Sequence, residues 1–230
     1  MAYCDRHATT AAPDGTPPGG AVSQAERVVT VPRERLTRWV TGFADRHGAP
    51  VATGDAAVVV LESPDGARAE IAVPFPPLAG PGDLPGLLAH VARDRRVGIL
   101  LVRKGGYAVG VADGVRLVSS KIGSGYVQGR TKAGGWSQQR YARRRDNQAA
   151  KLYDGAAEVA VALLASESLE AVVTGGDKPA VAAVLADPRL AALESLVLPR
   201  TYPVVDPRLR VLEAFPATYL AVSIRLNALA

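Results

Sequence analysis

The sequence predicts an α/β (α+β) fold in which a mixed sheet is flanked by helices. Apolar runs of strand length are joined in pairs by residues that favour tight turns, which indicates antiparallel hairpins. Other segments carry apolar residues at helical spacing and lie between strands, as crossover helices do. Hydrophobic residues make up 48% of the 230-residue chain, which is enough for one well-packed core.

The chain begins with a segment too rich in proline, glycine, alanine and threonine to fold by itself. Residues 1–22 are therefore expected to be a disordered tail, and residues 23–230 to form one domain. The elements expected in the first half are a strand over residues 28–31, a helix from Pro32 to Gly48, strands over 57–61 and 69–73 joined by a turn over 63–66, and a helix capped by Asp83.

The second half alternates strands and helices, and Asp113-Gly114 is a strong signal for a tight hairpin turn. A long helix is expected to begin at Gln138 or Gln139, with basic first turns and an apolar stripe only in its later turns. The other expected elements are strands over residues 97–103, 107–112, 115–122, 169–173, 196–198 and 219–226, and helices over 177–186 and 207–215.

Positive charge is concentrated in one segment, residues 114–145, which contains no acidic residue. Its eight cations leave −3 for the remainder of a chain whose net charge is +5. This distribution is typical of proteins that bind a phosphate backbone, although a solvated basic face without a partner is the simpler reading of an arginine run. The eight cations are Arg116, Lys121, Arg130, Lys132, Arg140, Arg143, Arg144 and Arg145.

Several kinds of chemistry are disfavoured by what the sequence contains. The three histidines, His7, His47 and His90, are far apart, and Cys4 is the only cysteine, so we expect no metal, no cofactor and no serine–histidine triad. The acids nearest the basic segment do not form a convincing catalytic pair. No run approaches the ~20 apolar residues of a membrane span, and with one cysteine and no signal-peptide pattern we expect a cytoplasmic protein.

Two glycine motifs offer weaker signals for anion binding. Residues 123–129 match a dinucleotide-binding loop in spacing, but a basic, glycine-containing segment follows where that loop requires an apolar-faced helix. Residues 173–177 form a strand-to-helix turn whose free amides can receive an anion, but such turns are common. We expect a structural role for both.

The remaining candidate is the segment 129–139, a run of glycines, cations and amides without a group that titrates near neutral pH. The amide of a glutamine, Gln138 or Gln139, cannot act as a general base, but it can orient a water while nearby backbone N–H groups stabilise an oxyanion. Gly134 and Gly135 lack a Cβ, which allows the backbone into a narrow RNA-lined space. The alternative is a flexible connection between a strand and a helix, and composition alone does not separate the two.

The segment from about Lys121 to Ala149 resembles the actinobacterial Vms-like release factors. These are relatives of the eukaryotic ribosome quality-control tRNA hydrolases and of the middle domain of eukaryotic peptide-chain release factors. In that group a strand ending in tyrosine and basic residues leads into a Gly-Gly loop with a glutamine. The matching residues here are Tyr126, Arg130, Lys132, Gly134, Gly135 and Gln138, and residues 144–147 are similar to the arginine-arginine-x-asparagine signature of the eukaryotic long helix.

This sequence departs from the release-factor pattern at the motif itself. Trp136 and Ser137 separate the two glycines from Gln138, and Gln139 follows directly, so either glutamine can supply the amide. Ser137-Gln138 resembles the quality-control members, which favours Gln138. The zinc-finger and ankyrin parts of the eukaryotic relatives have no counterpart in this sequence.

The resemblance implies a release-factor-like catalytic domain of the middle-domain, ribonuclease H-like type over residues 23–230. It implies a peptidyl-tRNA hydrolase that frees nascent chains from stalled large subunits, assisted by ribosomal RNA. The alternatives are a tRNA endonuclease that cuts near the 3′ CCA end and a non-catalytic ribosome- or RNA-binding module. The implied catalytic residues are Gln138, Gly134, Gly135 and Gln139, and the implied RNA-binding residues are Arg130, Lys132, Arg140, Arg143, Arg144, Arg145 and Lys121.

Overall fold

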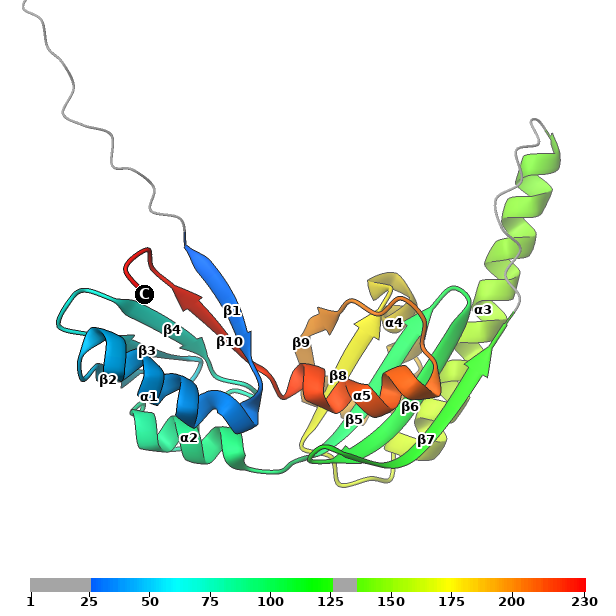
Figure 1. Cartoon of the computed structure of the whole chain (residues 1–230). Helices are drawn as coiled ribbons and strands as arrows, with labels where there is room; N and C mark the ends of the chain where they lie inside the picture. The colour runs from blue at the N-terminus through cyan, green and yellow to red at the C-terminus, as the bar shows by residue number, and fades with distance from the viewer. Residues whose placement is uncertain (1–25, 126–135) are drawn as a thin grey trace, which may run out of the picture.

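The computed structural model of the chain describes residues 26–125 and 136–230. The predicted tail over residues 1–22 lies outside the described residues. The described chain forms two lobes, each built on its own five-stranded sheet, and two connections join them side by side (Figure 1). We call them the first lobe, which contains β1 and both ends of the described chain, and the second lobe, which contains the start of α3.

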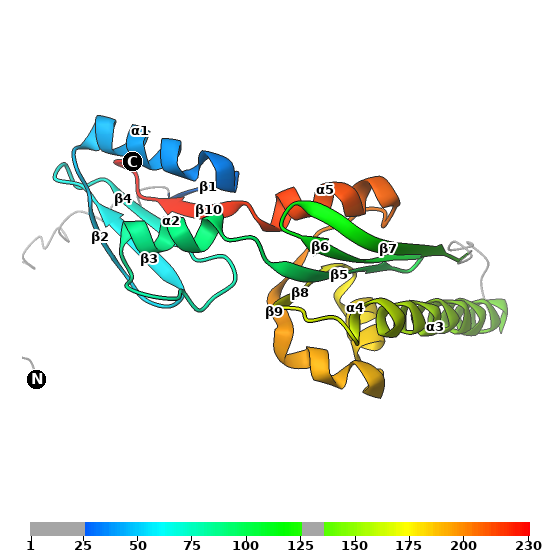
Figure 2. The ribbon, with the colours of Figure 1, turned by 90° about the horizontal axis from the view of Figure 1, so that it is seen from below.

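The first lobe is an antiparallel sheet in the order β1-β10-β4-β3-β2. Helices α1 and α2 cover one face of it (Figure 2). Its elements are β1 (Arg27–Val31), η1 (Arg33–Arg35), α1 (Leu36–His47), β2 (Val51–Gly54), β3 (Val58–Glu62), β4 (Arg68–Ala72), α2 (Leu84–Ala92) and β10 (Val222–Leu226).

Helix α2 begins where the sequence predicts it, because the side chain of Asp83 accepts a hydrogen bond of 2.8 Å from the Gly86 N–H. Replacing Asp83 with alanine is expected to lower the free energy of unfolding by about 1 kcal/mol. Urea unfolding measures this change. Asp45→Ala, at an exposed position of α1, is the control and should stay within about 0.5 kcal/mol. Equal losses in the two variants would contradict the capping role.

The second lobe is a mixed sheet in the order β7-β6-β5-β8-β9, in which β5, β8 and β9 are parallel and β6 and β7 are antiparallel to their neighbours. Helices α3 and α4 cover one face, and α5 covers the other (Figure 2). The elements are β5 (Arg96–Arg103), β6 (Gly106–Asp113), β7 (Arg116–Ser124), α3 (Trp136–Leu164), β8 (Ala171–Gly176), α4 (Lys178–Leu185), η2 (Pro188–Leu196), β9 (Val197–Tyr202) and α5 (Leu209–Tyr219).

The fold class is as predicted, and the differences lie in short or irregular elements. Strand β2 was not expected, because its four residues contain a glycine and show no alternation of buried and exposed side chains. Helix α5 continues past its predicted end at Phe215, since Pro216 and Tyr219 are both buried against the sheet. The single domain over residues 23–230 stays a prediction; those residues that are described build two sheets with separate hydrophobic clusters.

One side chain connects the lobes directly. Phe75, from the loop between β4 and α2, belongs to the hydrophobic cluster under α5 in the second lobe. The centroids of its ring and of the Tyr219 ring are 6.0 Å apart in an edge-to-face arrangement. The Arg95 guanidinium carbon lies 5.0 Å from the centroid of the Phe75 ring. The two lobes therefore share an aromatic contact as well as their two backbone connections.

Candidate functional site

The predicted catalytic segment spans the boundary of the described structure. Gly134 and Gly135, together with Arg130 and Lys132, lie outside the described residues. The backbone of Gln138 and Gln139 is in the first turn of α3, because this helix begins at Trp136. The helix was predicted to begin at one of the glutamines and starts two residues before the first of them.

Helix α3 extends well beyond the sheet that supports it (Figure 1). It has 29 residues, which corresponds to a length of about 43 Å. Among its described side chains, Leu152 is the first that is buried, and Arg143 and Asn147 are exposed. The distance along the axis from Trp136 to Leu152 is about 24 Å. The half of α3 that carries the two glutamines and the arginines therefore projects from the second lobe.

The strand and the helix that flank residues 126–135 are held together at their base. The N–H of Gly125 donates a hydrogen bond of 3.2 Å to the carbonyl of Gly105 in the turn between β5 and β6. A Cβ at Gly125 would lie 3.1 Å from the side chain of Leu152 on α3. The end of β7 thus contacts both the neighbouring turn and the first buried residue of the helix.

The ring of Tyr107 completes this base. A Cβ on Gly123 of β7 would lie 2.2 Å from the ring, and one on Gly155 of α3 would lie 3.7 Å from its hydroxyl. Because Gly123 lacks a Cβ, the ring can lie over the strand, and Gly155 places the helix within ordinary contact distance of the hydroxyl. We call Tyr107, Gly123 and Gly155 the base contact. It fixes the point from which α3 leaves the sheet.

The charges around this end of the sheet are mainly positive. Lys104 is exposed in the β5–β6 turn, and Lys121 is exposed on β7. Among the side chains that the structure describes, no ion pair joins these lysines or Arg143 to an acid. Asp177 lies 3.4 Å from Arg103. Burial, followed by the charge of Asp177, raises the pKa of Tyr153 on α3.

The predicted RNA-binding residues thus fall into three groups. Arg143, Arg140, Arg144 and Arg145 share the projecting half of α3, and the side chain of Arg143 is the one of these that is described. Lys121 lies on β7 three residues before the strand ends, so it is near the base rather than at the tip. Arg130 and Lys132 fall in the segment that is not described.

The histidines of the described chain have structural neighbours. His47 Nδ1 lies 2.8 Å from the carboxylate of Asp65, and His90 Nε2 lies 2.8 Å from the carbonyl oxygen of Pro74. In the same residues, no group of three or more histidine, cysteine or acidic side chains could hold a metal ion. No helix described in this structure is both long enough and apolar enough to cross a membrane.

The structure also locates the two glycine motifs. Gly123 lies inside β7, so residues 123–129 begin within a strand. In the turn after β8, the Asp177 N–H already donates to the carbonyl of Val102 at 2.8 Å. Gly176 adopts a φ of +99° there, and a Cβ on it would lie 2.1 Å from the Val102 oxygen. The glycine is therefore required by the close approach of β5 and β8.

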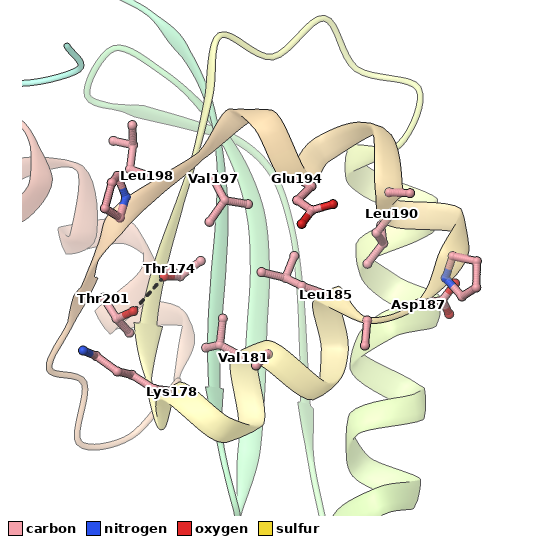
Figure 3. A pocket seen from close by; sticks show the side chains of 15 residues that line it. Thr174, Lys178, Val181, Leu185, Asp187, Leu190, Glu194, Val197, Leu198 and Thr201 are labelled. Atoms are coloured by element: carbon pink, nitrogen blue, oxygen red, sulfur yellow. Dashed lines mark hydrogen bonds between the residues drawn. The ribbon is translucent and has the colours of Figure 1, made fainter. Parts of the chain in front are cut away.

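A groove that the sequence does not reveal lies elsewhere on the second lobe. It has a volume of about 680 Å³ and lies between α4, η2 and the edge strand β9 (Figure 3). None of the residues that line it belongs to the base contact or to α3. It depends on the packing of η2, which the sequence pattern did not predict as a helix.

A known protein family matches the part of the chain that builds the second lobe, including the base contact and all of α3. The model of the family described as "Actinobacteria/chloroflexi VLRF1 release factor" matches residues 95–225, more than half of the chain. The chain belongs to this release-factor family. The resemblance seen in the sequence is therefore confirmed. Membership of this family implies a release-factor-like role at the ribosome, with tRNA as a partner.

Among solved structures, two archaeal proteins show a distant similarity to this VLRF1-type release factor. The archaeal translation termination factor aRF1 is 16% identical, with a TM-score of 0.42, over 87% of this chain and 68% of the other. A second structure, titled "Archaeal protein", is 17% identical with a TM-score of 0.36 over the same shares. No curated protein matches the sequence.

Proposed function

We propose that this VLRF1-family release factor hydrolyses the ester of peptidyl-tRNA on obstructed large ribosomal subunits, with Gln138 as the residue that positions water. One observation supports the proposal above others. Gln138 is in the first turn of α3, about 21 Å along the axis from Leu152, which is the first buried described side chain of that helix. A segment presented in this way can reach a bond that lies inside another macromolecule.

The chemistry needs little from the protein beyond position. The Gln138 amide would hold a water against the ester carbonyl, and backbone N–H groups of the glycine-rich segment would stabilise the oxyanion. The water oxygen would bond to the carbonyl carbon, and the bond from that carbon to the ribose oxygen would break. The products would be a peptide acid and a tRNA with a free 3′-terminal hydroxyl. Ribosomal RNA would supply the remaining contacts.

Phosphate binding would come from the cations near the tip and base. Arg130, Lys132, Arg140, Arg143, Arg144, Arg145 and Lys121 would neutralise tRNA or ribosomal RNA phosphates. This reading favours a cytoplasmic location, where ribosomes work. It also makes the affinity for large subunits dependent on salt.

Arg143→Gln is expected to weaken binding to large subunits and to reduce the dependence of log K on log salt by about 0.7 to 0.9. Arg143 is exposed on the projecting half of α3, whereas Arg116 is exposed at the opposite end of β7. Arg116→Gln is therefore the matched control and should leave the slope unchanged. Sedimentation binding to large subunits at salt concentrations from about 50 to about 200 mM measures both salt slopes. Identical slopes for the wild type and Arg143→Gln would argue against this contact.

The function is tested by incubating the protein with stalled large subunits that carry labelled peptidyl-tRNA, and sizing both products. Free peptide together with full-length tRNA is the expected result. A peptide still attached to a short 3′ fragment of the tRNA, together with a shortened tRNA, would indicate an endonuclease. Salt-dependent binding with intact peptidyl-tRNA would indicate a docking module, and either outcome would overturn the proposal.

A further inference from the structure

The groove of about 680 Å³ on the second lobe is within the roughly 300–1,000 Å³ that small-molecule sites occupy. Its walls are apolar and come from three elements, α4, η2 and β9 (Figure 3). The apolar side chains in its lining include Val181, Leu185, Leu190, Val197 and Leu198. The groove is open, so a bound molecule can enter it without movement of the lobe.

One end of the groove offers hydrogen-bond donors without an acceptor. Thr174 is 2% exposed, and its hydroxyl donates to the Thr201 hydroxyl at 3.4 Å. A threonine hydroxyl can both donate and accept, so the Thr201 hydroxyl can also donate to a molecule in the groove. The side chain of Lys178 extends toward Thr201 (Figure 3). Among the described residues Lys178 has no ion-pair partner, since the neighbouring Asp177 pairs with Arg103.

The other part of the rim offers an acceptor without a donor. Glu194 of η2 lines the groove across from Lys178, with Leu185 between them (Figure 3). In the part of the chain that is described, its carboxylate pairs with no cation, whereas the nearby Asp187 is occupied by Arg189 at 2.7 Å. The groove is thus complementary to a molecule with an anion at one end, an apolar body and N–H donors at the other.

We propose that this groove binds a nucleotide with a guanine base. The phosphate would accept from Lys178 and Thr201, the base would lie between the aliphatic walls, and the Glu194 carboxylate would accept from its ring N–H and amino group. Guanine presents two adjacent donors on that edge, whereas adenine presents a ring acceptor beside its amino group. A peptide strand added to β9 is disfavoured, because Pro199 has no N–H to donate at this edge.

The site differs from the segment that carries the proposed hydrolysis, and the full-length protein without ribosomes is sufficient to test it. Calorimetric titration with GMP should show saturable binding with one site per chain, and AMP should bind about tenfold more weakly. Lys178→Gln should weaken GMP binding about tenfold or more. Lys151→Gln, an exposed lysine of α3 that does not line the groove, should leave the affinity unchanged.

Two further variants separate recognition from folding. Glu194→Gln should remove the preference for GMP over AMP while keeping phosphate binding, because an amide both donates and accepts. Ala186→Trp fills the groove from an exposed position and should abolish binding without lowering the melting temperature.

A short unstructured RNA that carries a single guanosine tests whether the groove binds a free nucleotide or a nucleotide within RNA. If the groove takes an unpaired nucleotide of RNA, Ala186→Trp should weaken the binding of this probe; if it takes a free nucleotide, Ala186→Trp should abolish GMP binding and leave the binding of the RNA unchanged. No binding of either probe at millimolar concentration, equal affinity for GMP and AMP in the wild type, or binding of trileucine in place of GMP would overturn the proposal.

Discussion

Gln138→Ala is expected to slow peptide release from stalled large subunits by roughly 10²–10³-fold, the effect of removing one well-placed polar group from an acyl-transfer site. The loss would come from the water that the amide no longer orients, and not from the fold. Gln138 is in the first turn of α3, about 21 Å along the axis from Leu152, the first buried described residue of that helix. Alanine is also a better helix former than glutamine.

Gln139→Ala is the matched control, because it removes the same side chain one residue later in the same turn. Release by this variant should stay within a few-fold of the wild-type rate. Circular dichroism and binding to large subunits verify that both variants fold and dock. Wild-type release by Gln138→Ala together with a loss in Gln139→Ala would move the assignment by one residue, and full activity in both would remove the amide from the mechanism.

Tyr107→Ala is expected to lower the free energy of unfolding by about 2 kcal/mol, because the partly buried ring loses its contacts with β7 and α3. The ring lies between Gly123 on β7 and Gly155 on α3, and neither glycine can fill the space. Helix α3 would then be less firmly fixed at the point where it leaves the sheet. We therefore expect slower release as well, through misplacement of the helix tip.

Tyr107→Phe separates packing from the hydroxyl group. It keeps the ring between the two glycines, so stability should remain within about 0.5 kcal/mol of the wild type and release should be normal. Chemical denaturation and the release assay measure the two effects. A Tyr107→Phe variant as defective as Tyr107→Ala would assign the role to the hydroxyl rather than to the base contact.

The sequence predicts the regular part of the fold because hydrophobic period and turn residues are local signals. The Asp83 cap and the Asp113-Gly114 turn are found where the residue types indicate. Strand β2 and helix η2 are missed, since the first is short and irregular in burial and the second is a 3₁₀ helix without a marked apolar stripe. The separation into two lobes is also not readable, because it depends on which strands pair across the whole chain.

The candidate site also has parts that the sequence predicts and parts that it does not. An acid-free basic segment and a glycine–glutamine motif can be recognised from residue order alone, and both lie within residues 95–225, which the family model matches. The base contact cannot be recognised in that way, because Tyr107, Gly123 and Gly155 come together only when α3 packs on the β6–β7 hairpin. The groove beside Lys178 likewise requires η2 to fold against α4.

In the proposed reaction, the bond that breaks is the ester between peptide and tRNA. The most direct test is to recover the tRNA after release by the wild-type protein and to aminoacylate it again without any repair enzyme. Ester hydrolysis leaves the 3′-terminal hydroxyl intact, so we expect full re-charging. Released tRNA that cannot be charged until its CCA end is rebuilt would contradict it.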